Sequence, residues 1–176
     1  MNRRAVLKLL GATSAVAIIG GGMYEVNRKH SEVSLESTLI FLKQLTPEKI
    51  TSTGQWPLAR AFEHLAQSIE FSMIGYPIMK SEFFQKTAGS IAFSVFNARG
   101  KMNHGLDEII PGEVIRKVPL TVSQALTRLV KSLEGFNDFS GVLKPHFAYG
   151  QLTKQQYALA HVMHINNHFE EFNTTY

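Results

Sequence analysis

The segment Lys154 to Phe172 reads KQQYALAHVMHINNHFEEF, and it is the most clearly helical stretch of the chain. Within it His164 and His168 are four residues apart, and His161 lies one turn before them. On a helix this spacing brings the side chains to one face, within about 60° of arc. Neutral imidazole is a ligand of divalent transition metals, so the segment predicts half of a four-coordinate metal site.

Four earlier segments also show the spacing of amphipathic helices. Apolar residues recur every three or four positions in residues 35–45, 55–74, 81–97 and 121–136. Ser34 and Thr121 are suited to cap two of these helices, and Thr153 caps the last helix with Gln156 in a capping-box pattern. No segment alternates as a half-buried strand does. The sequence therefore predicts an all-α fold, an up-and-down four-helix bundle with an extra short leading helix over residues 35–45.

Composition and charge exclude several classes of protein. The 176 residues are enough for one domain with a core, and no internal repeat is present. The chain has no cysteine, which excludes disulfides, thiolate zinc fingers and iron–sulfur clusters and leaves His, Asp and Glu as ligands. The formal charge of +4 arises entirely within residues 1–29, because residues 30–176 carry equal numbers of basic and acidic side chains. We therefore expect no nucleic-acid partner, since such a partner requires a basic face on the folded domain.

Residues 1–24 have the features of a targeting segment. A basic start, Asn2 to Lys8, precedes an apolar run from Leu9 to Met23 that is shorter than the ~20 residues of a membrane-spanning helix. Arg3-Arg4 followed by Ala-Val-Leu-Lys resembles a twin-arginine signal, which implies the twin-arginine export machinery and a periplasmic or cell-envelope location. A general-pathway signal remains an alternative. No clear Ala-x-Ala cleavage site follows, so a tether to the inner membrane through residues 5–24 also stays open. A polar linker over 25–33 would connect this segment to the bundle over 34–173.

His64, midway along the second predicted helix, is the best third ligand. Three histidines leave one coordination position open, which is typical of a catalytic rather than a structural metal. Glu171 follows His168 by three residues and would act as a proton acceptor or would orient a ligand. His161 and Gln67 are further candidates for orienting the ligands, and His161 is also an alternate ligand.

The opposing interpretation is that these histidines are buried core residues satisfied by hydrogen bonds. His104 and His146 fall in the irregular segments 101–119 and 137–152, which we expect to form pocket walls, so both would contact a substrate unless they are simply solvated. The chain lacks a His-Glu-x-x-His motif, a Glu-x-x-His pair, a P-loop and a Gly-x-Ser-x-Gly motif.

Three segments together resemble a known family. Trp56–Pro77, Phe139–Thr153 and His161–Phe172 are similar to the bacterial family called domain of unknown function 1569, which resembles the DinB/YfiT-like four-helix superfamily of metalloenzymes. The resemblance covers residues 35–172 and implies one divalent metal, Zn, Ni or Fe, bound by His64, His164 and His168. The superfamily often has His where this chain has Asn167 and Gln where it has Glu171, and the carboxylate would change the surroundings of the metal.

Two functions follow as hypotheses. The first is an exported metal-dependent hydrolase or thiol transferase that acts on a small molecule. The second is a non-catalytic bundle that binds a ligand or partner in the cell envelope, and a membrane-tethered structural protein is a third. The sequence leaves the reaction, the substrate, the metal's identity, signal cleavage and the oligomeric state open.

Overall fold

The computed structural model describes residues 15–19, 22–26 and 34–174. The chain divides into two compact units, Met1–Glu32 and Val33–Tyr176, and each is described by itself. In the first unit β1 (Ala15–Ile19) and β2 (Gly22–Val26) form an antiparallel pair. The basic start of the expected targeting segment and residues 27–33 of the expected linker lie outside the described residues.

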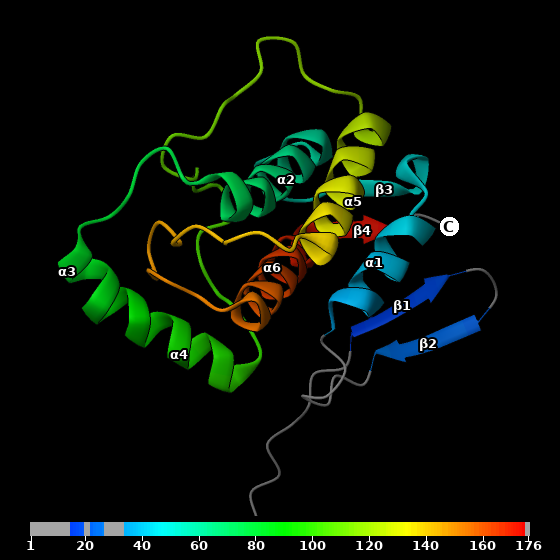
Figure 1. Ribbon diagram of the computed structural model, residues 1–176. Coiled ribbons are helices and arrows are strands. Elements are labelled where there is room, and N and C mark those ends of the chain that lie inside the picture. Colours follow the sequence, from blue (N-terminus) through cyan, green and yellow to red (C-terminus); the bar gives the residue numbers. More distant parts are fainter. Residues whose placement is uncertain (1–14, 20–21, 27–33, 175–176) are drawn as a thin grey trace, which may run out of the picture. The chain divides into compact units, whose positions relative to one another are not determined.

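The second unit is mostly helical, as the sequence predicts (Figure 1). Four of its helices are α1 (Leu35–Gln44), α2 (Leu58–Ile74), α5 (Val122–Asp138) and α6 (Lys154–His168). Three of them begin at the predicted caps. The Ser34 side chain accepts a hydrogen bond from the first turn of α1, and Thr121 and Thr153 form complete capping boxes on α5 and α6.

These four helices pack against one another around a shared core. α2 contacts α5 and α6, and α1 contacts the same two helices. Apolar residues at helical spacing are fully buried where the helices meet: Leu42, Phe62, Leu65, Ile69, Leu129, Leu133, Phe136, Tyr157, Met163 and Ile165. Burial of each large apolar side chain contributes about 1.5–3 kcal/mol. The core thus holds α2 and α6, which carry the expected ligands, side by side.

The segment expected as a helix over 81–97 is helical but packs differently. It comprises α3 (Glu82–Phe84), a π-helical turn η2 (Gln85–Gly89) and α4 (Ser90–Arg99). Phe83 and Ile91 are 79% and 64% exposed, whereas Phe93 is buried against Tyr149 with ring centroids 5.4 Å apart. The apolar spacing predicted a helix of the central bundle, but α1, expected as an addition, is the helix that contacts α5 and α6.

Gly89 allows the helical segment 82–99 to pack closely against the loop that follows α5. A Cβ at Gly89 would lie 1.8 Å from the carbonyl oxygen of Ala148, so only glycine permits the approach. The backbone N–H of Lys80 also donates to the carbonyl oxygen of Phe147. The helical segment 82–99 and the 144–150 loop therefore form one side of the molecule together. Among residues 15–19, 22–26 and 34–174, no helix is both long and apolar enough to cross a membrane.

The prediction that the chain contains no strand is wrong. Two short strands pair in antiparallel fashion just beyond the C-terminal end of α6. η1 (Pro47–Lys49) leads into β3 (Ile50–Ser52), and η3 (Phe169–Glu171) leads into β4 (Phe172–Thr174). Ser52 lies opposite Phe172. The helix predicted through Phe172 ends at His168 instead, because Phe169 and Phe172 turn onto Phe41 and Phe62, with ring centroids 5.2 and 5.6 Å apart.

Candidate metal centre

His64 on α2 and His164 and His168 on α6 converge in the interior. One ring nitrogen from each can be chosen so that all three lie within 4.8 Å of one another. The Nε2 atoms of His64 and His164 are 3.2 Å apart. All three residues are buried, at 8% exposure or less. The sequence prediction that two distant helices would bring these rings together is confirmed.

The three rings are spaced as imidazoles around one ion are spaced. Their centroids are 5.0 Å (His64 to His164), 5.1 Å (His64 to His168) and 5.1 Å (His164 to His168) apart. Metal–nitrogen bonds of about 2.0–2.1 Å in a tetrahedral site place nitrogens about 3.3 Å apart and ring centroids about 5 Å apart. The centroid separations, and the 3.2 Å between the Nε2 atoms of His64 and His164, therefore fit a common ion.

The electrostatics of the site favour the neutral rings that a metal requires. Burial, with a smaller contribution from the neighbouring His64, lowers the pKa of His164 well below its ordinary value. The same causes lower the pKa of His168 to about 3. Nε2 of His168 is buried and has no hydrogen-bond partner among the described residues. An orphaned nitrogen costs free energy in the interior, and a bound cation would satisfy it.

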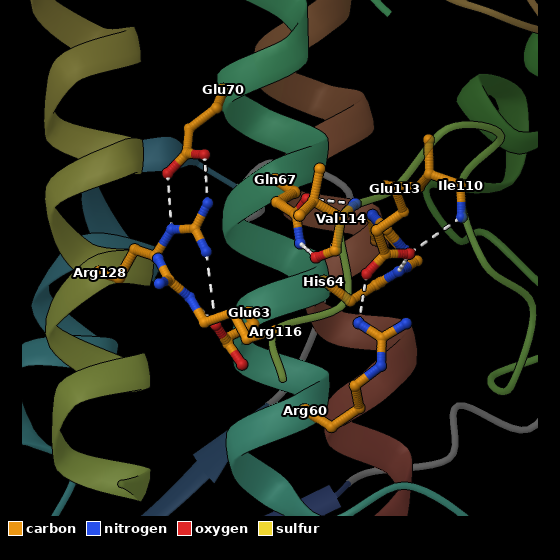
Figure 2. A network of polar contacts seen from close by, with 11 residues as sticks. Arg60, Glu63, His64, Gln67, Glu70, Ile110, Glu113, Val114, Arg116 and Arg128 are labelled. Carbon is orange, nitrogen blue, oxygen red and sulfur yellow. Dashed lines mark hydrogen bonds and ion pairs between the residues drawn. The ribbon is translucent and has the colours of Figure 1, made fainter. Parts of the chain in front are cut away.

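Glu113 is a site residue that the sequence reasoning missed. One carboxylate oxygen is 2.9 Å from Nδ1 of His64, and the other accepts a hydrogen bond from Arg60 (Figure 2). Burial by itself raises the pKa of Glu113, but the hydrogen bonds from His64 and Arg60 outweigh it and lower the pKa to about 2. Because the ionised carboxylate can only accept, Nδ1 of His64 carries the hydrogen, and Nε2 is the nitrogen available to a metal.

Gln67, expected to orient the ligands, contacts the loop that carries Glu113 instead. Its side-chain amide donates to the backbone oxygen of Val114 at 3.0 Å and accepts from the backbone N–H of Val114 at 2.9 Å. Gln67 therefore acts on the site through the 101–119 segment and not by contact with the histidines. Polar residues on an otherwise buried helix, Arg60, Glu63 and Gln67, were the sequence signal for such a partner.

Trp56 covers the site from the side of the loop before α2. Its ring is edge-on to His64 with centroids 5.0 Å apart and nearly parallel to His168 at 6.0 Å. The guanidinium of Arg60 lies 4.3 Å from the Trp56 centroid. The hydrogen bonds from Thr53 to the backbone oxygen of Glu171 hold this loop at the end of α6. Trp56 thus packs against two of the three histidine rings from this direction.

His104 lies on another side of the three rings. Its centroid is 4.9 Å from His164 and 5.8 Å from His168, and its Nδ1 donates to the backbone oxygen of Gly105 at 2.7 Å. His104, His64 and His164 line a cavity of about 220 Å³. The two loops predicted as pocket walls supply most of its other lining: Met102, Glu108, Ile109, Ile110, Phe147, Ala148 and Tyr149.

His146 lines the same cavity, but its ring is held by the protein. Its Nδ1 accepts hydrogen bonds from the backbone N–H groups of Ala148 and Tyr149, at 3.1 and 3.2 Å. The ring stacks on Tyr149 with centroids 4.2 Å apart. Burial, with a smaller contribution from His161, lowers the pKa of His146 to about 3. The position next to the cavity agrees with the prediction, and the ring also organises the 144–150 loop.

His161 and Glu171 do not join the three histidines. Nε2 of His161 is 3.3 Å from Oγ of Ser72, and because that hydroxyl already donates to Ile69, the imidazole is the donor. Burial lowers the pKa of His161 to about 3. The carboxylate of Glu171 lies against Gly54, and within the described part of the chain it makes no hydrogen bond or ion pair with a histidine.

Comparison with known proteins gives one finding. Residues 28–175 match the model of a family described as a protein of unknown function (DUF1569). Searches of curated proteins and of solved structures found no match.

Proposed function

Because the chain belongs to this family of unknown function, we propose its function from the geometry of its own residues: it binds one divalent transition metal through His64, His164 and His168. The single observation that carries the proposal is the orphaned Nε2 of His168, which lies beside two other buried imidazoles at metal-like spacing. Zn, Ni and Fe all accept imidazole ligands, so the donor set fits each of them.

We propose that the protein uses this metal as a hydrolase or thiol transferase on a small molecule. Three protein ligands leave a position for a fourth. A bound metal would supply Lewis acidity or lower the pKa of a water molecule. The residues of the chain would provide the rest: Trp56 excludes water on one side, and the cavity of about 220 Å³ beside His64 and His164 admits a compact substrate.

The broader setting is also a proposal. We propose that α1, α2, α5 and α6 form a DinB-like bundle, which their mutual contacts support. The Arg3-Arg4 pattern supports export through the twin-arginine machinery to the periplasm or cell envelope, with residues 5–24 as a tether if they are not cleaved. Export of a folded chain would suit a metal inserted before transport.

A second candidate, a non-catalytic envelope bundle that binds a ligand or partner, is favoured by one contact. The 3.2 Å separation of Nε2 of His64 and Nε2 of His164 permits a hydrogen bond between the two rings without any ion. In that case the histidines would be polar core residues.

Elemental analysis of the purified chain tests the first candidate. After exposure to Zn²⁺, Ni²⁺ or Fe²⁺, we expect about one equivalent of metal in the wild type and less than about a tenth in His168→Gln. His161→Gln is the matched control, because this buried histidine lies on the same helix but bonds to Ser72. A wild type without metal, or equal loss in both variants, would leave the second candidate.

A further inference from the structure

We propose that Glu113 couples metal binding at the three histidines to docking of the 101–119 segment against α2. The inference rests on the metal site proposed above. Glu113 lies 49 positions after His64, which it contacts, on the segment that forms a wall of the cavity.

Glu113 is the point where this segment meets a proposed ligand. Its side chain is fully buried, and the carboxylate accepts hydrogen bonds from Arg60, from His64 and from the backbone N–H of Ile110. All three groups are donors directed at one carboxylate. A neutral amide of the same shape would turn its NH₂ toward one of them, so the site specifically requires an anion.

Residues that follow Glu113 are attached to the same face of α2. Arg60, Glu63, His64 and Gln67 have the spacing of one helical face, and Figure 2 shows them directed at the segment. Glu63 pairs with Arg116 at 2.7 Å, and Gln67 forms two hydrogen bonds with the backbone of Val114. The position of the Glu113 carboxylate is therefore set by the docking of the stretch from Glu113 to Arg116.

The same segment also forms the cavity. Met102, His104 and the stretch Glu108–Ile110 line it, and Ile110 donates its N–H to Glu113. When the segment is docked, the carboxylate holds the hydrogen on Nδ1 of His64 and leaves Nε2 for the metal, which strengthens this ligand. Coupling of two equilibria is reciprocal, so a bound metal must in turn favour the docked segment and the formed cavity.

The test compares Glu113→Gln with Glu70→Gln in the full chain, using Zn²⁺ as the probe. Glu70 is a matched control, because it belongs to the same charged network on α2 but binds Arg128 and Ser132 of α5. Zinc affinity is measured by competition titration, and hydrogen exchange of the backbone amides of residues 106–116 is measured with and without zinc. Circular dichroism establishes that each variant is folded.

We expect Glu113→Gln to bind zinc about 10–100-fold more weakly than the wild type, and Glu70→Gln to bind as the wild type does. Zinc should slow exchange in residues 106–116 of the wild type, and this protection should diminish in Glu113→Gln. Glu113→Asp, which keeps the charge with a shorter reach, should recover part of the affinity. Equal affinity in the wild type and Glu113→Gln, equal loss in both Gln variants, or the absence of zinc-dependent protection would each overturn the coupling. A wild type that binds no zinc would instead overturn the metal site on which the coupling rests.

Discussion

His146 and His161 can be compared with His164 and His168, because all four are buried and burial lowers the pKa of each. Their nitrogens meet different surroundings. Nδ1 of His146 accepts two backbone N–H groups and Nε2 of His161 bonds to Ser72, whereas Nε2 of His168 has no partner in the described part of the chain. Burial and a low pKa are thus shared by the structural histidines and by the proposed metal ligands. Among these four, an unsatisfied nitrogen marks His168 alone, and His164 shares its site, with Nε2 3.2 Å from Nε2 of His64.

Adding metal should give the largest effect and separate the two groups most clearly. Zinc at about 1,000 times its dissociation constant should raise the free energy of unfolding of the wild type by about 4 kcal/mol. His164→Gln should lose this gain, because a ligand is removed. Urea unfolding with zinc and with a chelator measures both values. A gain in His164→Gln as large as that of the wild type would place His164 with the structural histidines.

Replacing a structural histidine should be costly without any dependence on metal. His146→Leu leaves the N–H groups of Ala148 and Tyr149 without their acceptor, so we expect a loss of about 2 kcal/mol or more in the free energy of unfolding. Urea unfolding should give the same loss with zinc and with a chelator. Val142→Ala, an exposed position in the same 137–152 segment, should change stability very little. A His146→Leu loss that appears only with zinc would contradict the comparison.

Lowering the pH should show whether His146 is held neutral in the folded protein, because the free energy of unfolding then depends on pH. The pKa of His146 is about 3 in the folded protein, below its ordinary unfolded value of about 6.5, so the unfolded chain binds a proton that the folded chain does not. The stability that neutral His146 contributes is complete above about pH 6.5 and is lost as pH falls toward 3. In metal-free protein, the difference in unfolding free energy between the wild type and His146→Leu should shrink by about 1.4 kcal/mol per pH unit below 6.5. A constant difference from pH 7 to pH 4 would show that His146 is not held neutral.

Replacing Tyr157 should have a smaller effect on stability, and it tests whether the surroundings of His161 are independent of the metal site. Tyr157 stacks on His161 and donates its hydroxyl to the backbone oxygen of Lys144 at 2.7 Å. Tyr157→Phe keeps the stacked ring and removes the hydrogen bond to Lys144, so we expect a loss of about 1 kcal/mol and unchanged zinc affinity. Thermal unfolding and zinc titration measure the two quantities, and weaker zinc binding would connect this group to the metal site.

Local sequence patterns correctly predicted features that depend on interactions between residues close together in the chain. The caps Ser34, Thr121 and Thr153 were correct, because a side chain that bonds the first turn acts within three residues. The meeting of His64 with the α6 pair was also predictable, because all three histidines lie on strongly patterned helices. The place of His64 midway along its helix, and then the resemblance, pointed to it as the third candidate ligand.

Contacts between distant segments were not predictable in this way. Glu113 reaches His64 from an irregular segment, and only the polar face of α2 hinted that a partner was needed. Helical spacing of Phe169 and Phe172 suggested that α6 continued, but their packing onto other aromatic rings ended it. The pattern in residues 81–97 gave a helix correctly, yet it could not indicate that Phe83 and Ile91 would remain exposed while Phe93 is buried.

Trp56 has a practical consequence, since it is the only tryptophan of the chain. Its indole lies 5.0 Å from the ring of His64 and 6.0 Å from that of His168, centroid to centroid. The tryptophan fluorescence of the protein therefore originates beside the candidate site. Emission under selective excitation should report occupancy, quenching and exposure there directly, without a label and without a known substrate.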